Sequence, residues 1–307
     1  MKTINKFLFA VLVAGTFLFS SCDEDDVANV APELTVAGVA TSNSDFSILV
    51  SALVKADLVS TLDGAGTFTV FAPTNAAFQA LFTDLGVTGI SDLSAETLKP
   101  ILLYHVLGVE KTSSMIQSGY YSSLSPAQGS YVTLSVKTGS GVKINNHATV
   151  TTADIEASNG VVHVIDKVLL PPTVVDIAIN NTDFSTLVDA VVKADLVETL
   201  SGAGPFTVFA PTNTAFSSLF TDLSVMGISD LTAQQLSPIL TYHVVSGNVL
   251  SSSLSNGNVA TLNGDITIAL GTPPTINTNS QIVVVDVQGT NGVVHAITKV
   301  LLPSNAK

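Results

Sequence analysis

A long internal repeat constrains the fold of this chain more than any other feature. Residues 45–85 and 183–223 are identical at 32 of 41 positions, at a constant offset of 138, and both contain the string FTVFAPTN. A period of this length is typical of whole domains rather than of solenoid repeats, because each copy can bury a hydrophobic core of its own. We therefore predict two similar domains, at 34–172 and 173–303.

The second copy is shorter than the first. Tyr104–His105 recurs at the same offset as Tyr242–His243, whereas the string NGVVH at 159–163 recurs at 291–295, which is an offset of 132. The second copy therefore lacks six residues between these two landmarks.

The front of each copy has the pattern of an amphipathic helix. Phe46, Leu49, Val50, Leu53 and Val54 fall at i, i+3, i+4, i+7 and i+8, so we expect them to form one inward face. The FTVF that begins the shared string is expected to be a short alternating strand, followed by a second helix.

The back of each copy changes to short β-branched runs separated by Gly, Asn and Ser, which is typical of strands. Helices followed by antiparallel strands indicate an α+β domain. Between the copies, the two prolines in 170–173 are expected to stiffen the joint. The expected strands are 132–136, 142–144 and 161–165 in the first copy, and 266–270, 282–287 and 293–297 in the second.

These motifs, in this order and twice over, resemble the fasciclin domain. FTVFAPTN, the Tyr-His pair, and NGVVH leading into Val-Leu-Leu-Pro occur in both copies, and the resemblance covers nearly all of 34–303. It implies that each copy is a β-wedge or sandwich of about seven strands with flanking helices. It also implies a role in adhesion to matrix or cells, without catalytic activity.

The N-terminus has the pattern of a bacterial lipoprotein signal. Lys2 and Lys6 precede an apolar run at 7–19, which is too short to span a bilayer and is soon followed by Cys22. This arrangement resembles a bacterial lipobox, whose cysteine is acylated after cleavage. We predict a signal peptide at 1–21, and the alternative is an ordinary secretory peptide with a chance cysteine.

An acidic segment follows the cysteine. Four acids at 23–26 begin a tether, 22–33, which should stay solvated because its like charges repel. Cleavage would remove two lysines and change the formal charge from −13 to −15. The acidic run resembles the export signal of surface lipoproteins of the Bacteroidota. We therefore expect a lipid-anchored protein, exposed on the bacterial outer membrane.

Composition excludes several classes of function. All eleven basic residues are lysine and there are 24 acids, so the chain offers no basic surface to nucleic acid. One cysteine excludes a disulfide framework and a cysteine-based zinc or redox site. Histidine-pair, EF-hand, nucleophile-elbow, phosphate-loop and dinucleotide motifs are absent from the sequence. We predict no catalytic site, metal or cofactor.

Four histidines match core positions. His105 lies on one helical stripe with Leu98, Ile101 and Leu102, and His243 occupies the same place in the second copy. His163 and His295 share a strand face with Val and Ile. We expect all four to be structural, with hydrogen bonds to satisfy them, although the family's Tyr-His pair is associated with receptor adhesion.

Four tyrosines are the candidate binding residues. Tyr104 and Tyr242 lie off the helical stripe and are expected to face solvent, and Tyr120 and Tyr121 form a local aromatic pair. The expected partner is extracellular matrix, polysaccharide or a cell-surface protein on neighbouring cells. The alternative is a surface hydrolase or metal-dependent enzyme whose site assembles only in the fold.

Overall fold

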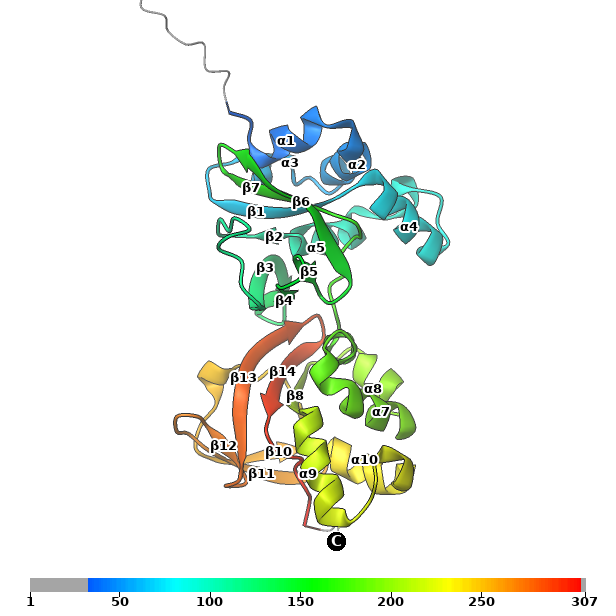
Figure 1. Ribbon diagram of the computed structural model, residues 1–307, viewed down its shortest axis with the longest axis vertical. Coiled ribbons are helices and arrows are strands. Elements are labelled where there is room, and N and C mark those ends of the chain that lie inside the picture. Colours follow the sequence, from blue (N-terminus) through cyan, green and yellow to red (C-terminus); the bar gives the residue numbers. More distant parts are fainter. Residues whose placement is uncertain (1–32, 305–307) are drawn as a thin grey trace, which may run out of the picture. The chain divides into compact units, whose positions relative to one another are not determined.

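The computed structural model describes residues 33–304, and the same succession of helices and strands occurs twice along them (Figure 1). The expected signal peptide, Cys22 and nearly all of the acidic tether lie outside the described residues. Among the described residues, 34–304 belong to one compact unit.

The first copy places most of its helices before most of its strands. Its helices are α1 (Val36–Ser42), η1 (Ser44–Phe46), α2 (Ser47–Lys55), α3 (Val59–Asp63), α4 (Asn75–Leu85), η2 (Ile90–Asp92) and α5 (Ala95–Tyr104). Its strands are β1 (Phe68–Pro73), β2 (Val106–Leu107), β3 (Gly119–Ala127), β4 (Ser130–Lys137), β5 (Lys143–Ile144), β6 (Ala148–Ala157) and β7 (Gly160–Ile165).

The second copy repeats this order and adds one short 3-10 helix. Its helices are α6 (Val174–Ile179), η3 (Thr182–Phe184), α7 (Ser185–Lys193), α8 (Val197–Ser201), α9 (Asn213–Leu223), η4 (Ile228–Asp230), α10 (Ala233–Thr241) and η5 (Ser251–Ser253). Its strands are β8 (Phe206–Pro211), β9 (Val244–Ser246), β10 (Gly257–Thr261), β11 (Gly264–Ala269), β12 (Thr275–Ile276), β13 (Ser280–Gly289) and β14 (Gly292–Ile297).

Each copy forms a seven-stranded sheet with the same topology. The orders are β2-β1-β7-β6-β5-β4-β3 and, in the second copy, β9-β8-β14-β13-β12-β11-β10. The predicted α+β class with about seven strands is confirmed. The strands at the back of each copy pair antiparallel with one another, as expected. The front strand, which the sequence did not place in the sheet, pairs in parallel, β1 with β7 and β8 with β14.

The parallel pair explains the glycine of the NGVVH motif. Gly160 lies opposite Phe68 with a φ of +149°, and a Cβ there would come within 2.0 Å of the Phe68 carbonyl oxygen. Gly292 has the same relation to Phe206, at 2.1 Å. Only glycine allows these two neighbouring strands, which are the first and the last of each copy in chain order, to approach this closely.

The inward faces differ in part from the sequence pattern. The sequence pattern did not predict helix α1, which packs on α2 and α3. Helix α2 buries Leu49, Ala52 and Leu53. Val54, which was expected to face inward, is 64% exposed. The expected alternation of β1 is also wrong, because all of its residues after the first are buried. A strand covered on both faces has no exposed side to alternate with.

The six-residue difference between the copies lies in one hairpin. Strands β3 and β4 occupy 119–137, whereas β10 and β11 occupy only 257–269. The longer hairpin turns at Gln128, whose Nε2 donates to the Thr290 carbonyl and whose carbonyl accepts from Asn248 Nδ2, both at 3.3 Å. The extra residues of the first copy therefore make contact with the second copy.

Among residues 33–304 no single helix is long and apolar enough to cross a membrane, although the bent pair Val36–Ser42 and Ser44–Lys55, with a bend of 104°, passes that test jointly.

Candidate functional site

The histidine of the first Tyr-His pair lies at the end of an amphipathic helix. His105 is the C-cap of α5 and is 2% exposed. Its Nδ1 donates to the Ile101 carbonyl (2.7 Å) and its Nε2 accepts from the Leu169 amide (2.9 Å). Because an amide can only donate, the ring must be neutral with its proton on Nδ1. His105 thus fastens α5 to the segment that follows β7.

His243 does the same in the second copy. Its Nδ1 donates to the Ile239 carbonyl (2.8 Å), and its Nε2 accepts from the Leu301 amide (2.9 Å). Burial lowers the pKa of both His105 and His243 to about 4, against a smaller raising effect of the helix carbonyl. Neither ring offers a free nitrogen for proton transfer, since both nitrogens are bonded to main-chain groups.

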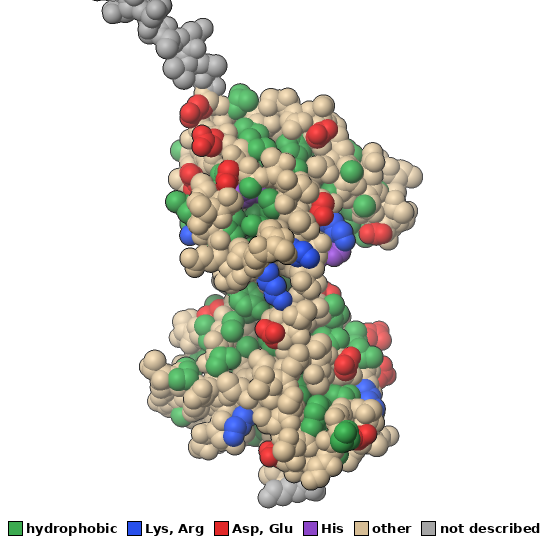
Figure 2. Space-filling view, in the orientation of Figure 1, with side chains coloured by type: hydrophobic (Ala, Val, Ile, Leu, Met, Phe, Trp, Pro, Cys, Tyr) green, Lys and Arg blue, Asp and Glu red, His purple; other side chains and the backbone are tan. Residues whose placement is uncertain are grey.

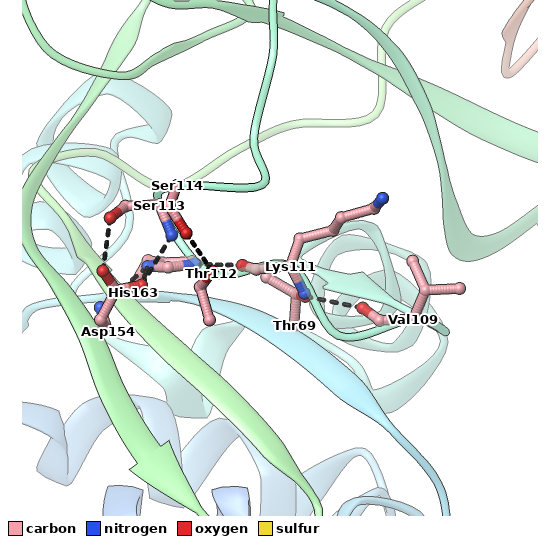
Figure 3. Close-up of polar contacts among 8 residues, drawn as sticks. All are labelled: Thr69, Val109, Lys111, Thr112, Ser113, Ser114, Asp154 and His163. Carbon is pink, nitrogen blue, oxygen red and sulfur yellow. Dashed lines mark hydrogen bonds and ion pairs between the residues drawn. The ribbon is translucent and has the colours of Figure 1, made fainter.

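A second histidine anchors the loop between β2 and β3 (Figure 3). His163 on β7 is fully buried, and its Nε2 donates to the Lys111 carbonyl at 2.8 Å. Its Nδ1 accepts from the Asp154 amide at 3.2 Å, and its ring stacks on Phe71 with centroids 5.6 Å apart. The ring therefore connects a loop, a strand and the core.

Asp154 extends this network to Ser113. It lies at a bulge of β6 with a φ of +60°, and its carboxylate accepts from the Ser113 amide (2.7 Å) and from the Ser113 hydroxyl. Burial acts to raise the pKa of Asp154, but the hydrogen bonds from Ser113 outweigh it and hold that pKa below its usual value. Thr69 holds the loop further along, through the Val109 carbonyl (2.6 Å) and the Lys111 amide (2.8 Å).

The network contains Ser, Asp and His but lacks the geometry of a catalytic triad. The Ser113 hydroxyl donates to Asp154, and both nitrogens of His163 are bonded to main-chain groups. In a serine triad the hydroxyl donates to the histidine, which the carboxylate orients. Here the Ser113 hydroxyl donates to the carboxylate instead, so His163 is not placed to act as its base, and the arrangement holds a loop in place.

The second copy builds the same network. The His295 Nε2 donates to the Val249 carbonyl (2.9 Å), and its Nδ1 accepts from the Asp286 amide (3.2 Å). Asp286 in turn accepts from the Ser251 amide (2.7 Å) and hydroxyl. Burial is the main cause of a lowered pKa at His295.

Sequence reasoning missed the serine and aspartate of this network. A signal was present, since Ser113 recurs as Ser251 at the offset of 138 and Asp154 recurs as Asp286 at the offset of 132. The offset is 138 before the shortened hairpin and 132 after it. Only an alignment of the two copies with a six-residue gap at this hairpin would have paired both residues.

The expectation that Tyr104 and Tyr242 face solvent is wrong, because they are 0% and 7% exposed. The Tyr104 hydroxyl donates to the Thr133 carbonyl (3.0 Å) and accepts from Asn145 Nδ2 (2.8 Å), and Tyr242 makes the matching bonds. Burial raises the pKa of Tyr104. Strand β3 packs on α5, so the residues off the main stripe of that helix are covered as well.

Tyr120 and Tyr121 do not form a free aromatic platform. Tyr120 packs against the hydrophobic core that the helices of the second copy form with its sheet. Its hydroxyl accepts from Asn181 Nδ2 (3.0 Å). The Tyr121 hydroxyl exchanges two hydrogen bonds, both of 3.0 Å, with the main chain of Gln117. Tyr131, at 52% exposed, is the tyrosine that presents its ring to solvent.

Most of the surface that Figure 2 shows is neutral. Figure 2 shows acidic and lysine side chains scattered among larger neutral areas of the visible face. A hollow of about 480 Å³ is lined by α4, residues 166–172 and α6, with Asp84, His147 and Asp176 among its polar groups. Within residues 33–304, no three His, Cys, Asp or Glu side chains lie close enough to hold a metal ion.

Comparisons with known proteins agree with this duplicated geometry. Residues 44–171 and 182–303 match the model of the Fasciclin domain family. Protein sll1483 of Synechocystis is 47% identical over 139 residues, which is 45% of this chain and 74% of that protein. Human periostin is 31% identical over 256 residues, which is 80% of this chain but only 29% of periostin. The pig transforming growth factor-beta-induced protein ig-h3 is 31% identical over 252 residues, with 36% of its length covered.

A solved structure supports the architecture of the pair. The FAS1 domain pair from the insect cell adhesion molecule Fasciclin I superimposes with a TM-score of 0.51, covering 86% of this chain and 99% of that one, at 18% identity. At this identity the likeness concerns the fold alone. From its two matched stretches and its paired seven-stranded sheets, this chain belongs to the fasciclin domain family and carries two such domains in tandem.

Proposed function

We propose that this protein is a non-catalytic adhesion protein of the bacterial cell surface. The observation that carries this proposal is the pair of fasciclin domains, whose motif histidines and tyrosines are all hydrogen-bonded within the fold. Binding then falls to the neutral surface. The partner is extracellular matrix, polysaccharide or a protein on a neighbouring cell.

Two modules compensate for weak single contacts. The chain has no tryptophan and no arginine, two of the side chains that most often dominate binding hot spots. Two domains on one chain, with many chains on one membrane, gain about 10²–10⁴ in avidity when both sites engage together. Adhesion should therefore need both copies.

Retention of cells on protein and polysaccharide matrices tests this mechanism. Cells would display the full chain or one copy at matched levels, and the full chain should be retained far better. Equal retention by one copy would contradict the avidity mechanism, and turnover of a glycan or ester panel by the purified chain would contradict a non-catalytic role.

The anchor in this proposal is an acyl group on Cys22, supported by the apolar run before it and the acids after it. Changing Cys22 to Ala should move the protein from the membrane fraction to the soluble fraction. Protease treatment of intact cells should digest the wild-type protein. A membrane-bound Cys22→Ala variant would contradict the anchor, and a protected wild type would contradict display at the surface.

A further inference from the structure

The helical side of the second copy contains an apolar cavity that is nearly closed in the first. The cavity has a volume of about 110 Å³ and lies among α6, α7, α8, α10 and β8. The matching space in the first copy, among α1, α2, α3, α5 and β1, has a volume of about 20 Å³. Two domains of one fold thus differ in the size of this interior space.

Three of the positions that line the larger cavity differ between the copies, Leu53/Val191, Ala37/Val175 and Thr41/Ile179, and only the first has the smaller side chain in the second copy. Leu53 lines the small space in the first copy, and the shorter Val191 takes its place in the second. Most other lining positions are identical, including Leu49 with Leu187 and Leu62 with Leu200. Losing a methylene from a packed wall leaves space that the neighbours refill only in part.

The lining has no group that would bind a polar molecule. His243 is its one polar side chain, and both of its ring nitrogens are already bonded to main-chain groups. No charged residue lines the cavity. A water molecule inside would find no partners, so the cavity favours apolar contents.

The cavity also has an apolar entrance. Ile179, Val192 and Val197 line it and are 56%, 60% and 36% exposed, so the wall continues to the surface of α6, α7 and α8. In the first copy the residue that matches Ile179 is Thr41. The second copy thus combines a larger interior with a more apolar rim.

We propose that this cavity binds a small uncharged apolar molecule, no larger than about one aromatic ring. Dry cavities of about 150 Å³ with Leu, Ile and Phe walls bind benzene or xenon, and this one is of the same order and open at its rim. The site belongs to the second copy alone. It is independent of the adhesion proposal, because it uses the helical side and needs no macromolecular partner.

Methyl NMR of the full chain, titrated with benzene and with xenon, tests the site. Saturable shifts are expected at the methyl groups of Val191, Val208 and Leu240, without comparable shifts at Leu53, Val70 and Leu102 of the first copy. The unmodified chain therefore contains its own internal control.

A reciprocal exchange of the wall residue sharpens the test. Val191→Leu restores the side chain that the first copy uses and should weaken benzene binding about tenfold or more, as one methylene in an apolar pocket typically does. Leu53→Val should create benzene-induced shifts in the first copy. Thermal unfolding would verify that both variants fold. Absence of saturable shifts in the unmodified chain, equal shifts in both copies, or unchanged affinity in a folded Val191→Leu variant would overturn the proposal.

Discussion

Four buried histidines act as two-sided connectors in this protein. His105 and His243 join a helix end to the segment after the last strand, and His163 and His295 join a loop to a strand bulge. Each ring uses one nitrogen as donor and the other as acceptor. Because a protonated ring has no acceptor, each connector requires a neutral histidine.

Removal of one connector should destabilise the fold. His105→Ala leaves the buried amide of Leu169 without its partner, so the free energy of unfolding should fall by about 1–3 kcal/mol. Urea denaturation of the full chain measures this loss. His147→Ala is the control, because that ring is exposed and its removal should change stability by less than about 0.5 kcal/mol. Equal losses in both variants would contradict a structural role for His105.

Stability should also fall as the pH drops from 6.5 to about 4. The folded-state pKa values of His105 and His243 are about 4, below the ordinary value of 6.5, so in this window only the unfolded chain protonates them. These two rings take up two protons on unfolding, so their contribution to the slope approaches about 2.7 kcal/mol per pH unit, and the full stabilisation is present above the ordinary pKa.

Urea midpoints measured across this pH range provide the test. His105→Ala and His243→Ala should each remove about half of this two-proton contribution, because each deletes one of the two protons. A stability profile that is flat between pH 4 and 6.5 would show that the buried rings do not control acid unfolding.

At the scale of elements, close approach of β1 and β7 fixes the sheet. Gly160→Ala would place a Cβ 2.0 Å from the Phe68 carbonyl oxygen, so the parallel pair must separate. We expect a loss of about 4 kcal/mol or more, or failure to fold. Gly89→Ala is the control, since its φ of 170° suits any residue and nothing lies within 4 Å of its Cβ. Far-UV circular dichroism with thermal unfolding compares the two, and similar stability would refute the argument.

The loop between β2 and β3 is an element held by side chains. Ser113→Ala removes one of the bonds to Asp154, so amide hydrogen exchange in residues 111–116 should accelerate while global stability changes by only about 1 kcal/mol. Ser122→Ala, at an exposed strand position, should leave the exchange of this loop unchanged. Unaltered exchange in the Ser113 variant would mean that Thr69 and His163 suffice to hold the loop.

At the scale of the whole molecule, the copies contact each other through more than the proline joint. The Thr133 hydroxyl accepts from the Gln288 amide (3.0 Å) and donates to the Asp286 carbonyl (3.4 Å). Gln288 is 1% exposed, whereas the matching residue in the first copy, Glu156, is exposed. A glutamine side chain suits this covered position, because the carboxylate of a buried glutamate without partners would be costly.

A change in the first copy should therefore be felt in the second. Thr133→Val leaves the Gln288 amide unpaired, so its hydrogen exchange should accelerate and the full chain should lose about 1–3 kcal/mol. Thr152→Val, the same substitution at an exposed site, is the control. Unchanged exchange at Gln288 would show that this contact does not stabilise the second copy.

Patterns in the sequence predicted much of this fold. The repeat established two equivalent halves, β-branched runs located core strands, and the stripe through Leu98, Ile101 and His105 placed that histidine inward. These features could be derived because side-chain periodicity records which face of one element is buried.

Other features depended on contacts between distant segments. The burial of Tyr104, the parallel pairing of Phe68 with Gly160, and the bond from Ser113 to Asp154 each join elements that are tens of residues apart. Periodicity carries no information on what covers the second face of a helix or strand, or on which strand lies beside it. These three features were decided only by tertiary packing, because they depend on which neighbouring elements cover a residue and not on the side-chain periodicity of its own segment.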